Sequence, residues 1–403
     1  KAPERSYRSI LKWGDPEAFK APNSKLYELM KETFHMTDDD FKVKQEMGLE
    51  EVDYDIPCRL SDDQIAALEA IVGKANVSTD NYDRLSVAYG KTMVDLMRLR
   101  KHIVENVPDA VVYPKNREDI IALVKYCCEQ KIPMYVYGGG SSVTRGVEAV
   151  KGGITLDMRK NFNKVISFSE HNQTITVEAG MSGPKLEETL NNAVSTLGAK
   201  RAYTCGHFPQ SFEYSSGGWA VTRGAGQNSS YYGKIEDIVI SQEYVTPIGI
   251  IKSDEFPRNA TGPSIDQIMM GSEGTFGILT HVTLRVFKYM PENRKKFSYV
   301  FKDWENGLNA AREIMQGEFG FPSVFRLSDP EETSIAFRLY GVADTVIDKM
   351  LAAKGYKDGK RVLMLGWSEG EKHFSKNVAK QIDKICKKHG AMYTTSIVTK
   401  GWE

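Results

Sequence analysis

The sequence contains few of the residues that build disulfide frameworks or metal sites. Five of its 403 residues are cysteine and seven are histidine. The cysteines are odd in number and form no Cys-x-x-Cys pair, which excludes a disulfide framework and a structural zinc site. The histidines are scattered without the spacing of metal ligands. We therefore expect no metal and a reducing, cytoplasmic location.

The chain also has no excess of charge of one sign. Its 53 Lys and Arg residues balance 53 Asp and Glu residues. Nucleic-acid binding would leave a basic excess or a basic cluster, and the basic stretch Lys372–Lys388 has the pattern of a solvated helix face instead. We therefore expect no nucleic-acid partner. The charge balance is compatible with a small-molecule or lipid-like substrate.

Long apolar runs are missing as well. No stretch reaches the roughly 18 uninterrupted apolar residues of a spanning helix. We expect no transmembrane segment, and peripheral membrane contact stays open. With 41% hydrophobic residues the composition is that of a globular protein. At about 150 residues per domain, the length predicts roughly two to three domains.

The pattern of the chain divides it into three parts. Residues 1–105 read as a helical lead-in, 106–289 as a domain of alternating strands and helices, and 290–403 as a second α/β unit of different rhythm. In the lead-in, the spacing of Ile65, Leu68 and Ile71 behind acidic residues predicts a helix.

The middle part begins with a strand–helix–strand unit. Ala110–Tyr113 predicts a strand, Asn116 can cap the following helix, and Pro133–Tyr137 predicts the second strand. We expect further strands at Ile154–Met158, Val165–Phe168, Thr174–Glu178, Ile235–Thr246 and Ile278–Val286, and a helix from Ser182. Residues 203–233 are aromatic and polar without clear periodicity, which favours a functional loop over disorder.

The last part alternates strands and helices again. We expect strands at Phe297–Phe301, Val324–Leu327, Val362–Leu365 and Met392–Thr395, and helices at Trp304–Met315, Glu331–Leu339, Val346–Ala353 and Lys372–Lys388.

The second strand of the middle part runs directly into Gly138-Gly139-Gly140-Ser141-Ser142. Glycine allows positive φ and a close approach to an anion, so that successive N–H groups can bind phosphate oxygens. The serines offer further donors, and Arg145 offers a charge. The loop lacks the dinucleotide fingerprint, because Val143 stands where the third glycine belongs. Taken alone, it is either a phosphate loop or a plain turn.

Two more glycine clusters follow, at 215–226 and 271–277. Three Gly- and Ser-rich loops beside strands suit a long ligand threaded through the domain. Three unrelated turns remain the alternative.

These motifs resemble the FAD-binding module of the vanillyl-alcohol-oxidase, or PCMH-type, family. The resemblance rests on Val136–Ser142, Cys205–Ser215, Gly217–Trp219 with Thr222 and Arg223, Tyr232–Asp237 and Gly271–Ile278. Within that group the chain is similar to the alkyldihydroxyacetonephosphate synthases and their bacterial relatives. The resemblance implies the α+β class: a two-subdomain PCMH-type FAD-binding fold followed by an α/β cap domain.

The resemblance also implies non-covalently bound FAD, since the pyrophosphate loop holds neither His nor Cys; attachment at Cys205 is the weaker alternative. The implied cofactor-binding residues are Val136, Tyr137, Gly138, Gly139, Gly140, Ser141, Ser142, Gln210, Ser211, Phe212, Glu213, Tyr214, Ser215, Ser216, Val221, Thr222, Arg223, Gly224, Glu273, Gly274, Thr275, Phe276, Gly277, Ile278 and Leu279. For Arg223, binding of the cofactor and capping of a turn are both open.

Two residues are candidates for catalysis. Arg326 matches a functionally important arginine in a cap strand of the family, and a strand arginine in a salt bridge is the alternative. His207 could carry a proton near a flavin, because its pKa is ordinarily close to neutrality, or it could be a hydrogen-bonded loop histidine. The family's catalytic tyrosine, a substrate-binding arginine and a histidine cluster would lie beyond Glu403. We therefore expect the C-terminal part of the cap domain to be missing.

The implied function is exchange of the acyl chain of acyl-dihydroxyacetone phosphate for a long-chain alcohol through a flavin N5 adduct, a step of ether lipid synthesis. The resemblance further implies a homodimer and, in a eukaryote, a peroxisomal location. One alternative is an FAD-linked dehydrogenase of a 2-hydroxy acid such as D-lactate. Another is a non-catalytic flavoprotein subunit.

Overall fold

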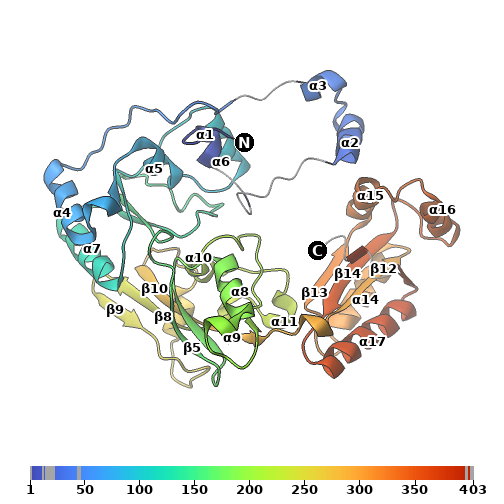
Figure 1. Cartoon of the computed structure of the whole chain (residues 1–403). Coiled ribbons are helices and arrows are strands. Elements are labelled where there is room, and N and C mark those ends of the chain that lie inside the picture. The colour runs from blue at the N-terminus through green and yellow to red at the C-terminus, as the bar shows by residue number, and fades with distance from the viewer. Residues whose placement is uncertain (1, 11–12, 14–22, 43–46, 395–397, 400–403) are drawn as a thin grey trace. The chain divides into compact units, whose positions relative to one another are not determined.

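The computed structural model describes residues 2–10, 13, 23–42, 47–394 and 398–399. The chain divides into two compact units (Figure 1). The first comprises Lys1–Ala18, Gln45–Gly226 and Lys234–Phe287, and the second comprises Phe19–Lys44, Gln227–Gly233 and Lys288–Glu403. Each unit has its own sheets and its own core.

The first sheet of the first unit has the order β1-β2-β4-β3. Its strands are β1 (Val77–Ser78), β2 (Ala110–Val112), β4 (Ile154–Asp157) and β3 (Met134–Tyr137). β2, β4 and β3 are parallel, and β1 is antiparallel to β2. Helix α7 (Arg117–Gln130) connects β2 to β3 and begins where the Asn116 side chain accepts from the Asp119 N–H at 2.9 Å. Parallel pairing leaves the glycine loop at the carboxyl end of β3.

The second sheet is antiparallel, with the order β5-β6-β10-β8-β9. Its strands are β5 (Val165–Ser169), β6 (Thr174–Glu178), β10 (Ile278–Arg285), β8 (Val239–Thr246) and β9 (Gly249–Lys252). Apolar residues from both sheets and from α7 form one continuous core. The prediction of an α+β fold with two subdomains and a cap is confirmed.

Short elements complete the first unit. They are α1 (Tyr7–Ile10), α4 (Asp62–Val72), the 3₁₀ turn η1 (Lys74–Asn76), α5 (Asn81–Ser86), α6 (Met93–Arg100), α8 (Gly183–Asn191), α9 (Ala193–Thr196), α10 (Ser216–Val221), α12 (Ile235–Ile238) and α13 (Ile265–Met269), with a two-stranded sheet of β7 (Tyr203–Thr204) and β11 (Phe287–Lys288).

Two sequence expectations need correction. The stretch 203–233 contains regular structure, including α10, in which Trp219 and Ala220 are buried. Its glycine pair hides the helical pattern, since glycine has low helix propensity. The expected strand Ile235–Thr246 is a helical turn, α12, followed by β8 from Val239. Ile235 and Ile238 are both buried and lie three residues apart, a spacing that places them on one face of a helix and on opposite faces of a strand.

The second unit is built around an antiparallel sheet of order β13-β14-β12-β15. The strands are β13 (Val324–Ser328), β14 (Val362–Ser368), β12 (Lys295–Phe301) and β15 (Met392–Tyr393); the helices are α2 (Ser24–Phe34), α3 (Asp38–Lys42), α11 (Ser229–Tyr232), α14 (Trp304–Met315), α15 (Pro330–Leu339), α16 (Val346–Ala353) and α17 (Lys372–Lys388), with the 3₁₀ turn η2 (Pro291–Asn293). Residue 395, the end of the last expected strand, lies outside the described residues.

Alternate residues of this sheet face two different cores. Phe297, Phe301 and Val362 pack with α14 and α17, whereas Val300 and Leu363 pack with Phe337 of α15 and Leu351 of α16. Figure 1 shows the long helices α14 and α17 together and α15 and α16 apart from them. Together, α15 and α16 are about as long as α17 alone.

Parts of residues 1–105 belong to each of the two units. Val77–Ser78 extends the first sheet, and Asn23 Nδ2 of the second unit donates to the Leu339 carbonyl at 2.7 Å. The division of the chain at residues 105 and 289 stays a prediction. In the described part of the chain, every helix is too short or too polar to span a bilayer.

Candidate functional site

The glycine loop after β3 is held against a buried tyrosine. Tyr137, the last residue of β3, is 2% exposed, and the Arg159 guanidinium lies 4.7 Å from its ring centre. Gly140 has φ +67°, and a Cβ there would lie 2.0 Å from the Tyr137 hydroxyl oxygen. Only glycine combines this backbone conformation with this close approach.

The second glycine cluster meets the first at the start of α10. The Ser215 side chain accepts from the Gly218 N–H at 3.1 Å, and the Gly217 N–H donates to the Ala179 carbonyl at 3.0 Å. A Cβ at Gly138 would lie 2.1 Å from Ser215 Oγ, and one at Gly217 would lie 2.6 Å from the Ala179 carbonyl oxygen. The ends of β3 and β6 and the start of α10 thus approach one another more closely than side chains would allow.

The third cluster completes a narrow cleft in the first unit. Its walls are formed by Val136, Gly138, Met158, Ala179, Ser215, Gly217, Gly218, Val221, Glu273, Gly274, Gly277 and Leu279. The structure therefore brings together predicted residues from the runs 136–142, 210–216, 221–224 and 273–279. Residues 210–214 of the second run do not line the cleft. The cleft volume is about 60 Å³, well below the roughly 300–1,000 Å³ of pockets that enclose a small molecule. It suits one section of a ligand as long as FAD.

Met158, Ala179, Gly217 and Gly218 line the cleft but are not among the predicted cofactor residues. Met158 directly follows β4, and Ala179 directly follows β6. Met158 is the last residue of the expected strand Ile154–Met158, and ligands of α/β folds bind at the carboxyl ends of parallel strands, so Met158 could have been included.

The other predicted cofactor residues surround the cleft without lining it. Tyr137, Ser216 and Ile278 are buried; Gly139, Gly140, Ser141, Ser142, Ser211, Phe212, Glu213, Tyr214, Arg223 and Gly224 are buried or half-buried; Gln210, Thr222, Thr275 and Phe276 are exposed. Gly139 lies against Tyr214, because a Cβ at Gly139 would be 2.2 Å from the Tyr214 Cβ.

The donors of this region fit an anionic cofactor. The hydroxyl oxygens of Ser142 and Ser216 are buried, and neither has a hydrogen-bond partner in the described part of the chain. Buried polar groups are costly unless they are hydrogen-bonded. Phosphate oxygens beside flexible glycine backbone would supply the missing acceptors, so the residues present fit FAD.

Arg145, whose charge the sequence offered to an anion, pairs with a carboxylate of the protein. Arg145 donates to both carboxylate oxygens of Glu148, at 2.7 and 2.8 Å, and Arg98 donates to the same carboxylate at 2.6 Å. Burial raises the pKa of Glu148, but the two guanidinium groups outweigh it and lower that pKa to about 2. The Arg145 guanidinium therefore has a carboxylate partner in Glu148, and the expectation that it offers its charge to a ligand stays a prediction.

Arg223 anchors a turn. Its guanidinium donates to the Met270 carbonyl at 3.1 Å and to the Gln267 carbonyl at 2.6 Å. Of the two interpretations that the sequence left open, the structure shows the structural one for the side chain. The Arg223 backbone, at φ +52°, remains part of the proposed cofactor site.

His207 is buried without a polar partner. The residue is 1% exposed, and neither ring nitrogen has a hydrogen-bond partner among the described residues. Its ring packs edge-on against Trp219, with ring centres 5.0 Å apart. The interpretation of His207 as a hydrogen-bonded loop histidine is therefore wrong for its ring nitrogens among the described residues. Burial lowers the pKa of His207 to about 4, so the ring is neutral near pH 7.

The low pKa of His207 predicts an acid-dependent loss of stability. The unfolded chain takes up a proton near pH 6.5 and the folded chain near pH 4, so the free energy of unfolding falls as the pH drops through this window. Between pH 6.5 and pH 4.5, an interval of two pH units, the free energy of unfolding should fall by about 3 kcal/mol. Denaturant unfolding at pH 7 and pH 4.5 should show this loss, and His207→Met should remove most of it. His171→Met, at an exposed histidine, is the control; equal pH slopes for the two variants would contradict the assignment.

The second unit holds a larger, mostly apolar cavity of about 750 Å³. It lies on the sheet face covered by α15 and α16, and it is lined by Val300, Arg326, Ser328, Glu332, Ile335, Ala336, Phe337, Leu339, Tyr340, Val342, Ile347, Leu351, Leu363, Leu365, Thr394 and Val398. Arg326 of β13 pairs there with Glu332 of α15. The salt bridge that was the alternative for Arg326 is thus present, at the wall of a cavity.

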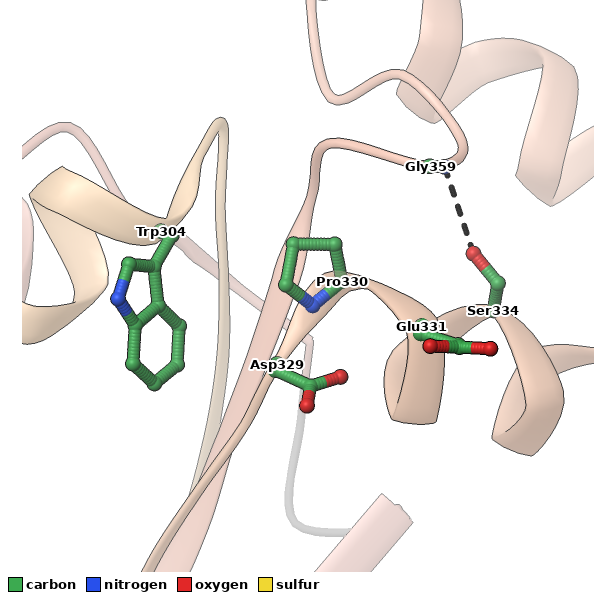
Figure 2. A pocket seen from close by; sticks show the side chains of 6 residues that line it. All are labelled: Trp304, Asp329, Pro330, Glu331, Ser334 and Gly359. Atoms are coloured by element: carbon green, nitrogen blue, oxygen red, sulfur yellow. Dashed lines mark hydrogen bonds between the residues drawn. The ribbon is translucent and has the colours of Figure 1, made fainter.

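A second hollow of the cap offers less chemistry. It is an open depression lined by Trp304, Asp329, Pro330, Glu331, Ser334 and Gly359 (Figure 2). Asp329 caps α15 by accepting from the Glu332 N–H at 2.7 Å, and the Ser334 hydroxyl accepts from the Gly359 N–H at 3.3 Å. Both polar groups serve the fold.

Comparisons with known proteins support an FAD-binding role for the first unit. Residues 108–254 match the model of an FAD binding domain. An alkyldihydroxyacetonephosphate synthase of Caenorhabditis elegans is 36% identical over 247 residues, which are 60% of this chain and 40% of that protein. A mitochondrial D-lactate dehydrogenase (cytochrome) of Arabidopsis thaliana is 33% identical over 189 residues, 46% of this chain and 32% of that protein.

A solved structure extends the similarity into the cap. A crystal structure of alkyldihydroxyacetonephosphate synthase matches with a TM-score of 0.80 and 25% identity, over 97% of this chain and 72% of that one. The chain spans less than half the length of the curated synthase and dehydrogenase described above. The expectation of FAD is confirmed. Residues 108–254 therefore belong to the PCMH-type family of FAD-binding domains, in a chain that is similar to alkyldihydroxyacetonephosphate synthases and to FAD-linked dehydrogenases.

Proposed function

We propose that the chain is the FAD-binding and cap portion of an alkyldihydroxyacetonephosphate synthase-like enzyme, which exchanges the acyl chain of acyl-dihydroxyacetone phosphate for a long-chain alcohol. The apolar cavity of the cap carries this proposal. A volume of about 750 Å³ lined by aliphatic and aromatic side chains suits a long alkyl chain. A small hydroxy acid would leave most of it unfilled.

The share of the chain that each relative matches also favours the synthase over the dehydrogenase. In sequence, the dehydrogenase match covers 46% of this chain, whereas the match to the Caenorhabditis elegans synthase covers 60% of it. An FAD-linked dehydrogenase of a 2-hydroxy acid remains the second candidate, because the two similarities overlap in the FAD-binding domain.

The chain's own residues would hold and orient the reactants. The pyrophosphate of FAD would be bound by Gly138–Ser142 and by the hydroxyls of Ser142 and Ser216. When bound, the flavin of FAD supplies an electron sink. The cavity would exclude water from an alkyl chain. Arg326 would fix an anionic group of the substrate at the polar wall of the cavity, with Glu332 holding the guanidinium in place.

His207 is the proposed site of proton exchange. Its ring is neutral near pH 7, so one nitrogen carries a proton and the other can accept one. Neither nitrogen has a hydrogen-bond partner among the described residues. A homodimer, a lipid-like substrate and a cytoplasmic location, peroxisomal in a eukaryote, belong to the same proposal.

Two measurements on the purified, FAD-loaded protein separate the candidates. The synthase proposal predicts that labelled hexadecanol enters acyl-dihydroxyacetone phosphate as the fatty acid leaves. The dehydrogenase candidate predicts that D-lactate or another 2-hydroxy acid bleaches the flavin absorbance under anaerobic conditions. Bleaching without exchange would refute the synthase proposal. Absence of both reactions would favour a non-catalytic flavoprotein subunit.

Arg326→Gln should lower kcat/KM for the exchange about tenfold to hundredfold, since hydrogen bonds to charged groups contribute about 1.5–3 kcal/mol. FAD occupancy should not change. Arg338→Gln is the matched control, because Arg338 pairs with Glu32 and does not line the cavity. Equal losses in the two variants would exclude Arg326 from the substrate site.

A further inference from the structure

Lys91 is a buried cation beside the glycine loop. The residue follows Gly90 in the connection between α5 and α6, and it is 8% exposed. Its backbone N–H donates to the Ser142 carbonyl at 2.9 Å, and its carbonyl accepts from Trp13 Nε1 at 3.1 Å. A Cβ at Gly90 would lie 2.1 Å from the Ser142 carbonyl oxygen, so this connection lies directly against the loop.

The ammonium group of Lys91 lies over an aromatic ring. It lies 5.9 Å from the ring centre of Tyr214, the residue that packs against Gly139. No carboxylate in the described part of the chain pairs with it. The nearby Arg159 is different, since it donates to both oxygens of Asp157 at 3.0 and 2.6 Å.

An unpaired ammonium in such a place is costly. Burial, with a smaller contribution from Arg159, lowers the pKa of Lys91 to about 8. Buried charges are normally paired, and a lysine that serves the fold alone would have a carboxylate partner. Here Arg145 has a carboxylate partner in Glu148, whereas Lys91 has none among the described residues and contacts Ser142, whose buried hydroxyl has no described partner either.

We propose that Lys91 binds the pyrophosphate of FAD at the Gly138–Ser142 loop. The inference rests on the proposed site at Gly138–Ser142. Lysine binds phosphate as a point charge, and two phosphate charges would give the ammonium the anionic partner that the protein does not provide. The lead-in would thereby contribute a cofactor-binding residue to the domain that follows it.

The test compares FAD binding with the stability of the apoprotein. Lys91→Met should weaken FAD binding about thirtyfold, in line with a charge-assisted hydrogen bond, while Lys91→Arg retains most of the affinity. Because Met removes an unpaired buried charge, the Tm of apo Lys91→Met should equal or exceed that of the wild type. Riboflavin, which lacks the pyrophosphate, should bind both proteins equally. Flavin fluorescence quenching measures each affinity.

Lys160→Met is the control, since Lys160 also lies over a tyrosine ring, at 4.4 Å, but is exposed and bonded to the Ala75 carbonyl. Unchanged FAD affinity of Lys91→Met, equal losses for FAD and riboflavin, or a lower apo Tm would each overturn the inference. Failure of the wild-type protein to bind FAD would instead refute the proposed site itself.

Discussion

Replacing Gly140 with alanine is expected to reduce FAD affinity at least about hundredfold, a cost of about 2.7 kcal/mol or more. At φ +67° the new Cβ would overlap the hydroxyl of Tyr137, which is buried and cannot withdraw. The loop would have to move away from the end of β3, and its N–H groups would lose their alignment on the pyrophosphate. Equilibrium titration of the apoprotein with FAD measures the effect.

Gly198→Ala is the matched control. Gly198 has φ +68°, and nothing lies within 4 Å of its added Cβ. It should carry the same left-handed backbone cost, about 1–2 kcal/mol of stability, with FAD affinity unchanged. If Gly140→Ala fails to fold, Gly274→Ala replaces it: its Cβ meets nothing closer than Val136 at 3.5 Å, and Gly274 lines the cleft. Full FAD affinity in both Gly140→Ala and Gly274→Ala would contradict the cofactor site.

Filling the cap cavity should change which alcohols are used. Ala336 lines the cavity, and Ala336→Trp would displace part of an alkyl chain bound there. Losing room for about three methylenes at about 0.8 kcal/mol each corresponds to roughly fiftyfold. We expect kcat/KM to fall by this factor for hexadecanol and to change little for butanol.

The control for this variant is Ala352→Trp, on an exposed position of α16 that does not line the cavity. Exchange rates with both alcohols, measured for the three proteins, give the discrimination. A uniform decrease for hexadecanol and butanol would show that the tryptophan disturbs the fold, and an unchanged hexadecanol rate would show that the chain binds elsewhere.

Much of the fold could be predicted because local signals and packing agree. Asn116 caps α7 and Ile120 and Leu123 share its buried face, so capping and periodicity point to the same helix. The misjudged region lies where they conflict. In α10 the low helix propensity of Gly217 and Gly218 is outweighed by burial of Trp219 and by the close approach to Ala179.

The site was less accessible from the sequence, because its contacts join residues far apart in the chain. Glycine placement identified the loops, but the pairing of Arg145 with Glu148 depends on side chains that only the folded loop brings together. Lys91 lies about fifty residues before the loop it contacts, and no motif marks it. The cavity around Ala336 likewise depends on how α15 and α16 cover their sheet, which periodicity does not specify.

The cofactor site is best tested by a crystal structure of the FAD-loaded protein. We expect pyrophosphate oxygens within about 3 Å of backbone N–H groups of Gly138–Ser142, with the cofactor continuing along the cleft lined by Gly217 and Gly274. Pyrophosphate bound away from the 138–142 loop would contradict this site.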